Sequence, residues 1–190
     1  MEIPAAGVGI VFFGIMVVGA LRRKAGNVVA RAQYPKLASK LGLSYSPSPY
    51  KKGVGKLSGQ VEGYSVVVDP DDQRRIYLRF SNSPPVELHS FIHNKRAASG
   101  LRSFRPSSAV LAGLFKTSHA SAEIIERLNH SEELIESLRP LKFLRPLKTL
   151  SVTSSGIAAV FDFGNPPYIP AEVVDDLLPR LCCLARTIEG

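Results

Sequence analysis

The sequence predicts an α+β protein, in which an N-terminal transmembrane helix precedes one domain with an antiparallel sheet packed against a few helices. Three observations lead to this prediction. The stretch Ile3–Leu21 contains no charged side chain. Apolar residues recur at every second position between residues 57 and 80, as in half-buried strands. Further along, apolar residues follow helical spacing, most clearly over residues 170–189.

The stretch Ile3–Leu21 is long enough to cross a bilayer. A helix of this length rises about 28 Å, close to the roughly 30 Å hydrocarbon core. A cleavable signal peptide is the main alternative, because Val18–Ala20 resembles a small-residue cleavage site. However, a signal peptide has its basic residues before the apolar stretch, and here only Glu2 precedes it. We therefore expect residues 1–24 to form a permanent anchor.

The positive charge of the chain is concentrated directly after this stretch. The net charge is +8; residues 22–61 contain nine Lys or Arg and no acidic residue, and the two signs balance from Glu62 onward. A nucleic-acid-binding protein would carry its surplus on the folded domain, so this distribution argues against nucleic acid and favours anionic lipid headgroups. The residues expected to contact the membrane surface are Arg22, Arg23, Lys24 and Arg31.

The same basic residues predict the orientation. Lys and Arg close to the end of a span tend to remain cytoplasmic. We therefore expect the N-terminus outside and the C-terminal domain in the cytoplasm, as in a single-pass protein of a bacterial inner membrane. The lipid bilayer is then the first partner of the chain.

Residues 25–55 are expected to form a basic juxtamembrane helix and linker. Pro35 suits the first turn of a short helix, and Gly42 suits the position just after its end. The segment SPSPYKKGVGK follows and is interpreted as the hinge into a domain of residues 56–190.

The domain is predicted to start with a three-stranded antiparallel meander. Turns are expected at Glu62-Gly63 and at Pro70–Asp72. A fourth strand is expected over PVELHSFIH, and the run VLAGLF is read as one more short strand. The alternating apolar sets of the meander are Leu57/Val61, Tyr64/Val66/Val68 and Ile76/Leu78/Phe80.

Helices and a hairpin are predicted for the second half. Two short helices, SAEIIERLN and SEELIESL, are expected to start at the N-caps Ser121 and Ser131, and Pro140 is expected to end the second. KTLSVTSSGIAAVFDFG predicts a hairpin that turns at Ser154–Gly156. We expect Pro179 to kink or split the last helix.

Several short motifs resemble a group of uncharacterised bacterial single-pass membrane proteins with an α+β domain of unknown function. They are LASKLGLSYSPSP, GKLSGQVEGYSVVVDP, RIYLRF, FKTSHASAEIIERL and CCLARTIE, spread over residues 36–190. The group shows Gly-Asp where this chain has Ser118-His119, and an aromatic residue at the position of Ala122. The resemblance implies the architecture and carries no catalytic residue with it.

Glu87, His89 and His93 are the candidate metal ligands, because they share one face of the expected fourth strand. No nearby Cys or HExxH pattern completes a zinc site, so surface histidines are the preferred interpretation and no cofactor is expected. The adjacent Cys182 and Cys183 are interpreted as core packing residues.

The sequence lacks G-x-S-x-G, a phosphate-binding loop and a nucleotide-binding G-x-G-x-x-G, so we expect no enzyme. The preferred function is a non-catalytic cytoplasmic interaction or scaffold domain on a single-pass anchor, as a subunit of a membrane complex with another protein. Two alternatives stay open: a peripheral binder of anionic lipid through residues 22–56, and a metal-dependent enzyme.

Overall fold

The computed structural model describes residues 28–50, 53–91, 106–115, 117–144, 146–164 and 168–190. A first helix covers residues 28–41. The following elements are β1 (Ser44–Ser46), β2 (Lys56–Val61), β3 (Tyr64–Asp69), β4 (Arg75–Arg79), β5 (Val86–Phe91), α2 (Ala109–Leu114), β6 (Thr117–Ala120), α3 (Ala122–His130), α4 (Glu132–Leu138), the 3-10 helix η2 (Arg139–Phe143), β7 (Leu147–Thr153), β8 (Gly156–Phe161) and α5 (Ala171–Glu189).

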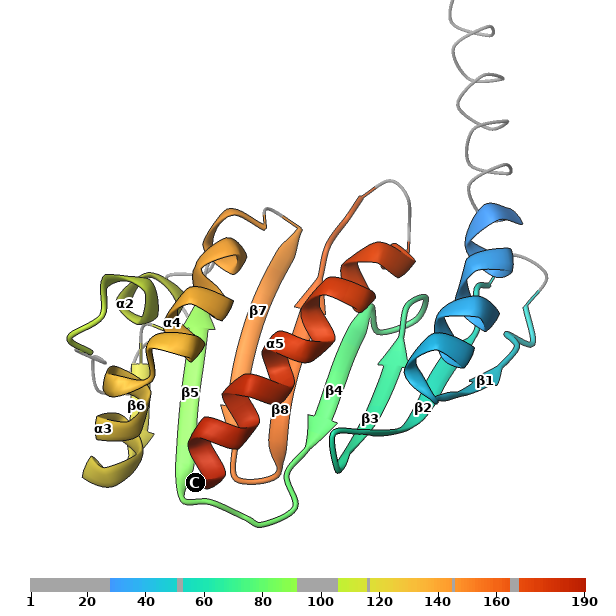
Figure 1. Cartoon of the computed structure of the whole chain (residues 1–190). Coiled ribbons are helices and arrows are strands. Elements are labelled where there is room, and N and C mark those ends of the chain that lie inside the picture. Colours follow the sequence, from blue (N-terminus) through green and yellow to red (C-terminus); the bar gives the residue numbers. More distant parts are fainter. Residues whose placement is uncertain (1–27, 51–52, 92–105, 116, 145, 165–167) are drawn as a thin grey trace, which may run out of the picture.

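The eight strands form one antiparallel sheet in the order β1-β2-β3-β4-β8-β7-β5-β6 (Figure 1). The predicted meander is confirmed as β2–β4, and β1 extends it by one edge strand. The predicted hairpin is confirmed as β7–β8, which inserts between β4 and β5. The α+β class is therefore confirmed.

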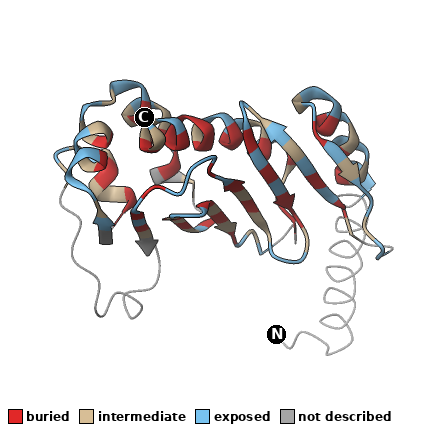
Figure 2. Cartoon of the chain, turned by 90° about the horizontal axis from the view of Figure 1, so that it is seen from below, coloured by how far each residue is buried: buried red, intermediate tan, exposed pale blue. Residues whose placement is uncertain are grey.

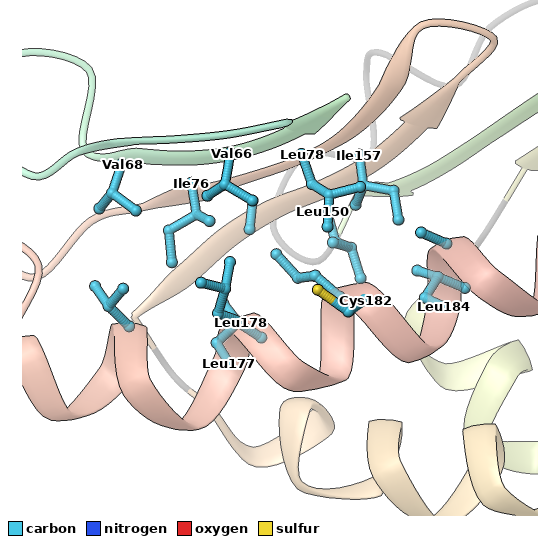
Figure 3. Close-up of a cluster of buried hydrophobic side chains, with 14 of the residues drawn as sticks. Val66, Val68, Ile76, Leu78, Leu150, Ile157, Leu177, Leu178, Cys182 and Leu184 are labelled. Carbon is cyan, nitrogen blue, oxygen red and sulfur yellow. The ribbon is translucent and has the colours of Figure 1, made fainter. Parts of the chain in front are cut away.

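The helices lie together on one face of the sheet (Figure 2). Every second residue of the central strands points toward them, as Val66, Ile76 and Leu78 do toward α5 (Figure 3). These three side chains are fully buried, and so are Leu178 and Cys182 of α5. The burial explains the period-two pattern of the strands: one side of each strand makes the core and the other does not.

The first helix packs into this same core. Its apolar residues fall at helical spacing, and Ala30, Tyr34 and Leu37 are buried with the rest of the domain. The phenolic hydroxyl of Tyr34 donates to the carbonyl of Ile169, 2.8 Å away, just before α5. Residues expected to form a connector therefore contribute a helix to the core and β1 to the sheet, so folded structure starts before residue 56.

The N-caps predicted for the two short helices are confirmed. The hydroxyl of Ser121 accepts from the N–H of Ile124, and that of Ser131 accepts from the N–H of Leu134, each at 3.3 Å. Pro140 follows the end of α4 as predicted, and the chain continues there as η2. Each cap satisfies one of the backbone donors that the first turn of a helix leaves free.

One sequence-based assignment is wrong, and one of two alternatives at Pro179 is excluded. The run VLAGLF belongs mostly to helix α2, because Leu111 and Leu114 are buried together at a spacing of three residues. A short apolar run does not distinguish a strand from a buried helical turn. Of the two alternatives expected at Pro179, a kink or a split, the split is wrong, because the last helix is continuous over Ala171–Glu189; the kink stays a prediction. Proline has no backbone N–H, so one carbonyl in the preceding turn of the helix lacks its usual donor. Pro179 is exposed, and this carbonyl is therefore on the side of the helix that is open to water.

Within the described residues, which begin at residue 28, no helix combines the length and apolar character needed to cross a membrane. The anchor expected at residues 1–24 lies outside them, together with Arg22, Arg23 and Lys24. The expected orientation stays a prediction for the same reason.

Candidate functional site

The second face of the sheet carries no described helix (Figure 2). The strand registers place Val67 opposite Tyr77, Tyr77 opposite Ala158 and Ala158 opposite Ser151. A row of small and apolar side chains therefore runs across the centre of this face. Val67 is 38% exposed. In the described part of the chain, it is the only exposed large hydrophobic side chain that lies on a strand.

Two arginines of β4 flank Tyr77 on this face. The guanidinium carbon of Arg75 lies 5.6 Å from the centre of the Tyr77 ring, in cation–π geometry. The hydroxyl of Tyr77 donates to the carbonyl of Ser155 at 3.1 Å. The ring is thus held at its face and at its tip, while Arg79 is exposed at the end of the strand.

We call this set the open-face patch, and its residues are Val67, Arg75, Tyr77, Arg79, Ala158 and Val160. Tyr and Arg are enriched at protein interfaces, where a rigid aromatic ring loses little conformational freedom on binding. The patch lies on paired strands, so its geometry is fixed by the sheet. Its aromatic ring and its two guanidinium groups can form stacking contacts and hydrogen bonds with another molecule.

The sequence contained a signal for this patch. Arg75, Tyr77 and Arg79 alternate with Ile76 and Leu78 in RIYLR, so they had to share the face opposite the core. The same alternation of polar and apolar residues also predicts the strand itself. The sequence does not indicate which strand lies beside β4. The structure shows that it is β8, which is distant in the sequence, and β8 completes the patch.

The acidic turn after β3 fixes a loop. Asp69 is only 5% exposed, and its carboxylate pairs with the Lys56 ammonium at 2.8 Å. This hydrogen bond is the main reason that the pKa of Lys56 is raised. Asp71 accepts from the N–H groups of Val54 and Gly55, and burial raises the pKa of its carboxyl despite these bonds. Asp69 also accepts from the N–H of Asp72 at 3.1 Å, which is the local bond that turn chemistry predicts, whereas the contacts with Lys56, Val54 and Gly55 join the turn to a distant part of the sequence.

Two of the candidate metal ligands are adjacent on β5. Nε2 of His89 lies 3.2 Å from Oε1 of Glu87, at the surface. His93 lies outside the described residues. In the portions of the chain that the structure describes, no group of three His, Cys, Asp or Glu side chains is arranged to hold a metal ion.

Arg31, expected at the membrane surface, contacts the loop before β2. Its Nε donates to the carbonyl of Gly53 at 2.6 Å, and its Nη2 donates to the carbonyl of Tyr50 at 2.8 Å. The side chain therefore links the first helix to residues about twenty positions later, a long-range contact that the sequence alone did not indicate.

The two cysteines are buried in α5 and are not bonded to each other. Burial raises the pKa of Cys182 to about 12, and burial together with Glu133 raises the pKa of Cys183. A thiol is nucleophilic only as the thiolate, so both are unreactive at neutral pH. The prediction that they are core residues is confirmed.

Two shallow depressions, of about 250 and 480 Å³, lie along α5 and share Asp175. An ion pair joins α5 to the first helix, and a hydrogen bond joins it to α4. Lys40 of the first helix contacts Asp175 at 2.6 Å, and Arg180 donates to the carbonyl of Ser137 at 2.6 Å while pairing with Asp176. Pockets for small molecules are usually enclosed, whereas both of these depressions are open to solvent.

The chain matches no known protein-family description and no curated protein sequence. Among solved structures it is similar to the crystal structure of the mycobacterial trehalose monomycolate transport factor A, TtfA. The two chains are 12% identical with a TM-score of 0.52, over 84% of this chain and 94% of that one. At this identity the likeness concerns the fold, over nearly the whole length of the neighbour.

Proposed function

We propose that the protein is a single-pass membrane protein whose domain is a non-catalytic docking module, and that it binds a partner protein through the open-face patch. The observation that carries this proposal is the patch itself. A two-layer domain buries one face of its sheet, and the other face here presents a held tyrosine between two arginines, beside Val67. Aromatic and Arg side chains are the usual anchors of interfaces.

Anchoring is supported by the sequence. Ile3–Leu21 has the length and apolar character of a span, and the basic residues that follow favour a cytoplasmic domain. An anchor confines the domain to the membrane surface, where the natural partner is a membrane protein or a protein held at the membrane. The first alternative, binding of anionic lipid through residues 22–56, is compatible with this arrangement rather than opposed to it.

The fold neighbour supports an accessory role. That protein is named as a transport factor, and we extend the analogy to propose that this chain serves a membrane complex. The analogy concerns fold, and function is decided by the site. The buried, protonated thiols and the ion-paired depressions along α5 favour a binding role over catalysis.

Site-specific photocross-linking in the cells that make the protein tests the proposal. A photoreactive residue replaces Val67, at the centre of the patch, or Glu126, exposed on α3 in the helical layer. We expect a discrete cross-linked species from position 67 that stays with the membranes after carbonate washing, and none from position 126. Equal cross-linking at both positions, or at neither, would contradict the proposal.

A further inference from the structure

Exposed apolar residues gather at one end of the first helix. Four large hydrophobic side chains are exposed among the residues that the structure describes, and three of them are Val28 (67%), Val29 (54%) and Tyr50 (67%). Val28 and Val29 begin the described part of the helix, and Tyr50 belongs to the loop before β2. The fourth, Val67, belongs to the open-face patch.

Arg31 brings these two segments together. Its guanidinium donates to the carbonyl of Tyr50 at 2.8 Å and to that of Gly53 at 2.6 Å. Val28 precedes Arg31 by three positions, so it lies on the same side of the helix as the loop. We call Val28, Val29, Arg31 and Tyr50 the anchor-proximal tip.

The tip is fixed to the domain rather than hinged to it. The loop that carries Tyr50 is held further along by Asp71, which accepts from the N–H groups of Val54 and Gly55. The hydroxyl of Tyr45 donates to the carbonyl of Val54 at 2.6 Å. The helix itself is held by Tyr34, whose hydroxyl reaches Ile169. Tyr50 is therefore displayed to solvent by a supported loop.

Chain length keeps the tip close to the expected anchor. Only residues 25–27 separate Lys24 from Val28. Four residue steps span at most about 14 Å, so the tip cannot move further than that from the end of residues 1–24. It lies at the β1 edge of the sheet, where the first helix starts (Figure 1).

The two segments that carry the tip contain basic residues and no acidic residue, and the Asp71 carboxylate beside the loop is partly buried and accepts two backbone N–H groups. Between Ile3 and Val61 the sequence has no acidic residue, and Lys51 and Lys52 follow Tyr50 directly. Aliphatic and tyrosine side chains with basic neighbours are typical of segments that lie in the interface of a membrane with anionic lipids.

We propose that the anchor-proximal tip is a membrane-contact surface, in which Val28, Val29 and Tyr50 enter the headgroup region of the bilayer that holds the anchor. Arg31 shapes this surface by holding the loop against the helix. The inference rests on the anchoring in the proposed function and adds that the domain is seated on the membrane in one orientation, with the β1 edge nearest the lipid.

The absence of tryptophan from the chain allows a direct test. The full chain carrying Tyr50→Trp is reconstituted into vesicles of phosphatidylcholine and phosphatidylglycerol, with and without brominated acyl chains that quench tryptophan on contact. Tyr77→Trp, on the open-face patch, is the matched control. Co-flotation with the vesicles is measured first, because it reports the anchor independently of the tip.

We expect both variants to float, Tyr50→Trp to lose most of its emission to brominated lipid, and Tyr77→Trp to keep its emission. Adding Val28→Asp to Tyr50→Trp should weaken the quenching, and Val28 is too exposed for this change to disturb the core. Flotation without selective quenching at position 50 would overturn the inference and leave the anchor intact. Loss of flotation would overturn both. An emission shift seen only in native membranes would assign the tip to a protein partner and overturn the lipid assignment.

Discussion

The two faces of the sheet differ in chemistry although the same strands form both of them. On β4, Ile76 and Leu78 are fully buried against the helical layer, whereas Arg75, Tyr77 and Arg79 alternate with them on the open face. The covered face is apolar and contacts α5; the open face is aromatic, basic and partly exposed. Core packing and the proposed docking therefore use alternate residues of one strand, and point substitutions can separate them.

The largest expected difference is between neighbours on β4. Leu78→Ala leaves a cavity in the core and should lower the free energy of unfolding by about 2–5 kcal/mol. Tyr77→Ala removes a partly exposed ring and should cost clearly less. Denaturant unfolding of the purified protein in detergent measures both. Equal costs would break the distinction between the two faces.

Thiol reactivity should sharpen the same comparison. Cys182 and Cys183 are buried, and burial raises their pKa values, so alkylation in the native protein should be slow and should become fast only after unfolding. A cysteine introduced by Val67→Cys on the open face should react rapidly under the same conditions. Mass spectrometry of the alkylated chain follows each site; rapid native labelling of Cys182 would show that the helical layer opens readily.

A polar contact should matter next, at the loop before β2. Asp71→Ala removes the acceptor for the N–H groups of Val54 and Gly55 and should cost about 1–3 kcal/mol. Asp71→Asn keeps an oxygen there and is the matched control, expected to cost less.

The pH dependence of this pair has a defined sign. Burial raises the pKa of Asp71 in the folded state, so its ionised form is disfavoured by folding. The stability of the native protein relative to Asp71→Asn should therefore rise as the pH falls through that pKa, because Asp71 becomes neutral. The opposite trend would mean that the two N–H bonds outweigh desolvation.

The smallest effect is expected at a helix end in the covered layer. Ser121→Ala removes the cap on the N–H of Ile124 and should cost about 1 kcal/mol, whereas Ser121→Asp should retain the cap. Thermal unfolding monitored by circular dichroism measures the difference. An unchanged midpoint for Ser121→Ala would show that α3 is held by its packing alone.

Local chemistry explains which elements the sequence could predict. Ser121 and Ser131 identify caps, and Glu62 and Gly63, with φ of 51° and 87°, form the tight turn expected between β2 and β3. These features depend on a few neighbouring residues. The insertion of β7–β8 between β4 and β5 depends on contacts across the whole chain, and no local pattern encodes it.

The same distinction applies to the candidate surfaces. Strand alternation in the sequence predicts that Arg75, Tyr77 and Arg79 of β4 share one face. It does not predict that residues of β8 lie next to them. Arg31 was recognised as a basic residue near the anchor, whereas its bonds to Tyr50 and Gly53 needed the fold. The run VLAGLF is too short for its periodicity to distinguish a strand from a helix, so only the structure places most of it in α2.

Recovery of the partner from membranes tests the central claim most directly. The complex is purified from cells that carry the native chain, Arg79→Glu on the open face, or Glu126→Lys on the helical layer, two exposed charge reversals of opposite sign. The account predicts that the native chain and Glu126→Lys retain a stoichiometric partner protein and that Arg79→Glu loses it while staying folded and membrane-bound. Retention of the partner by Arg79→Glu, with loss in Glu126→Lys, would contradict the account and assign docking to the helical layer.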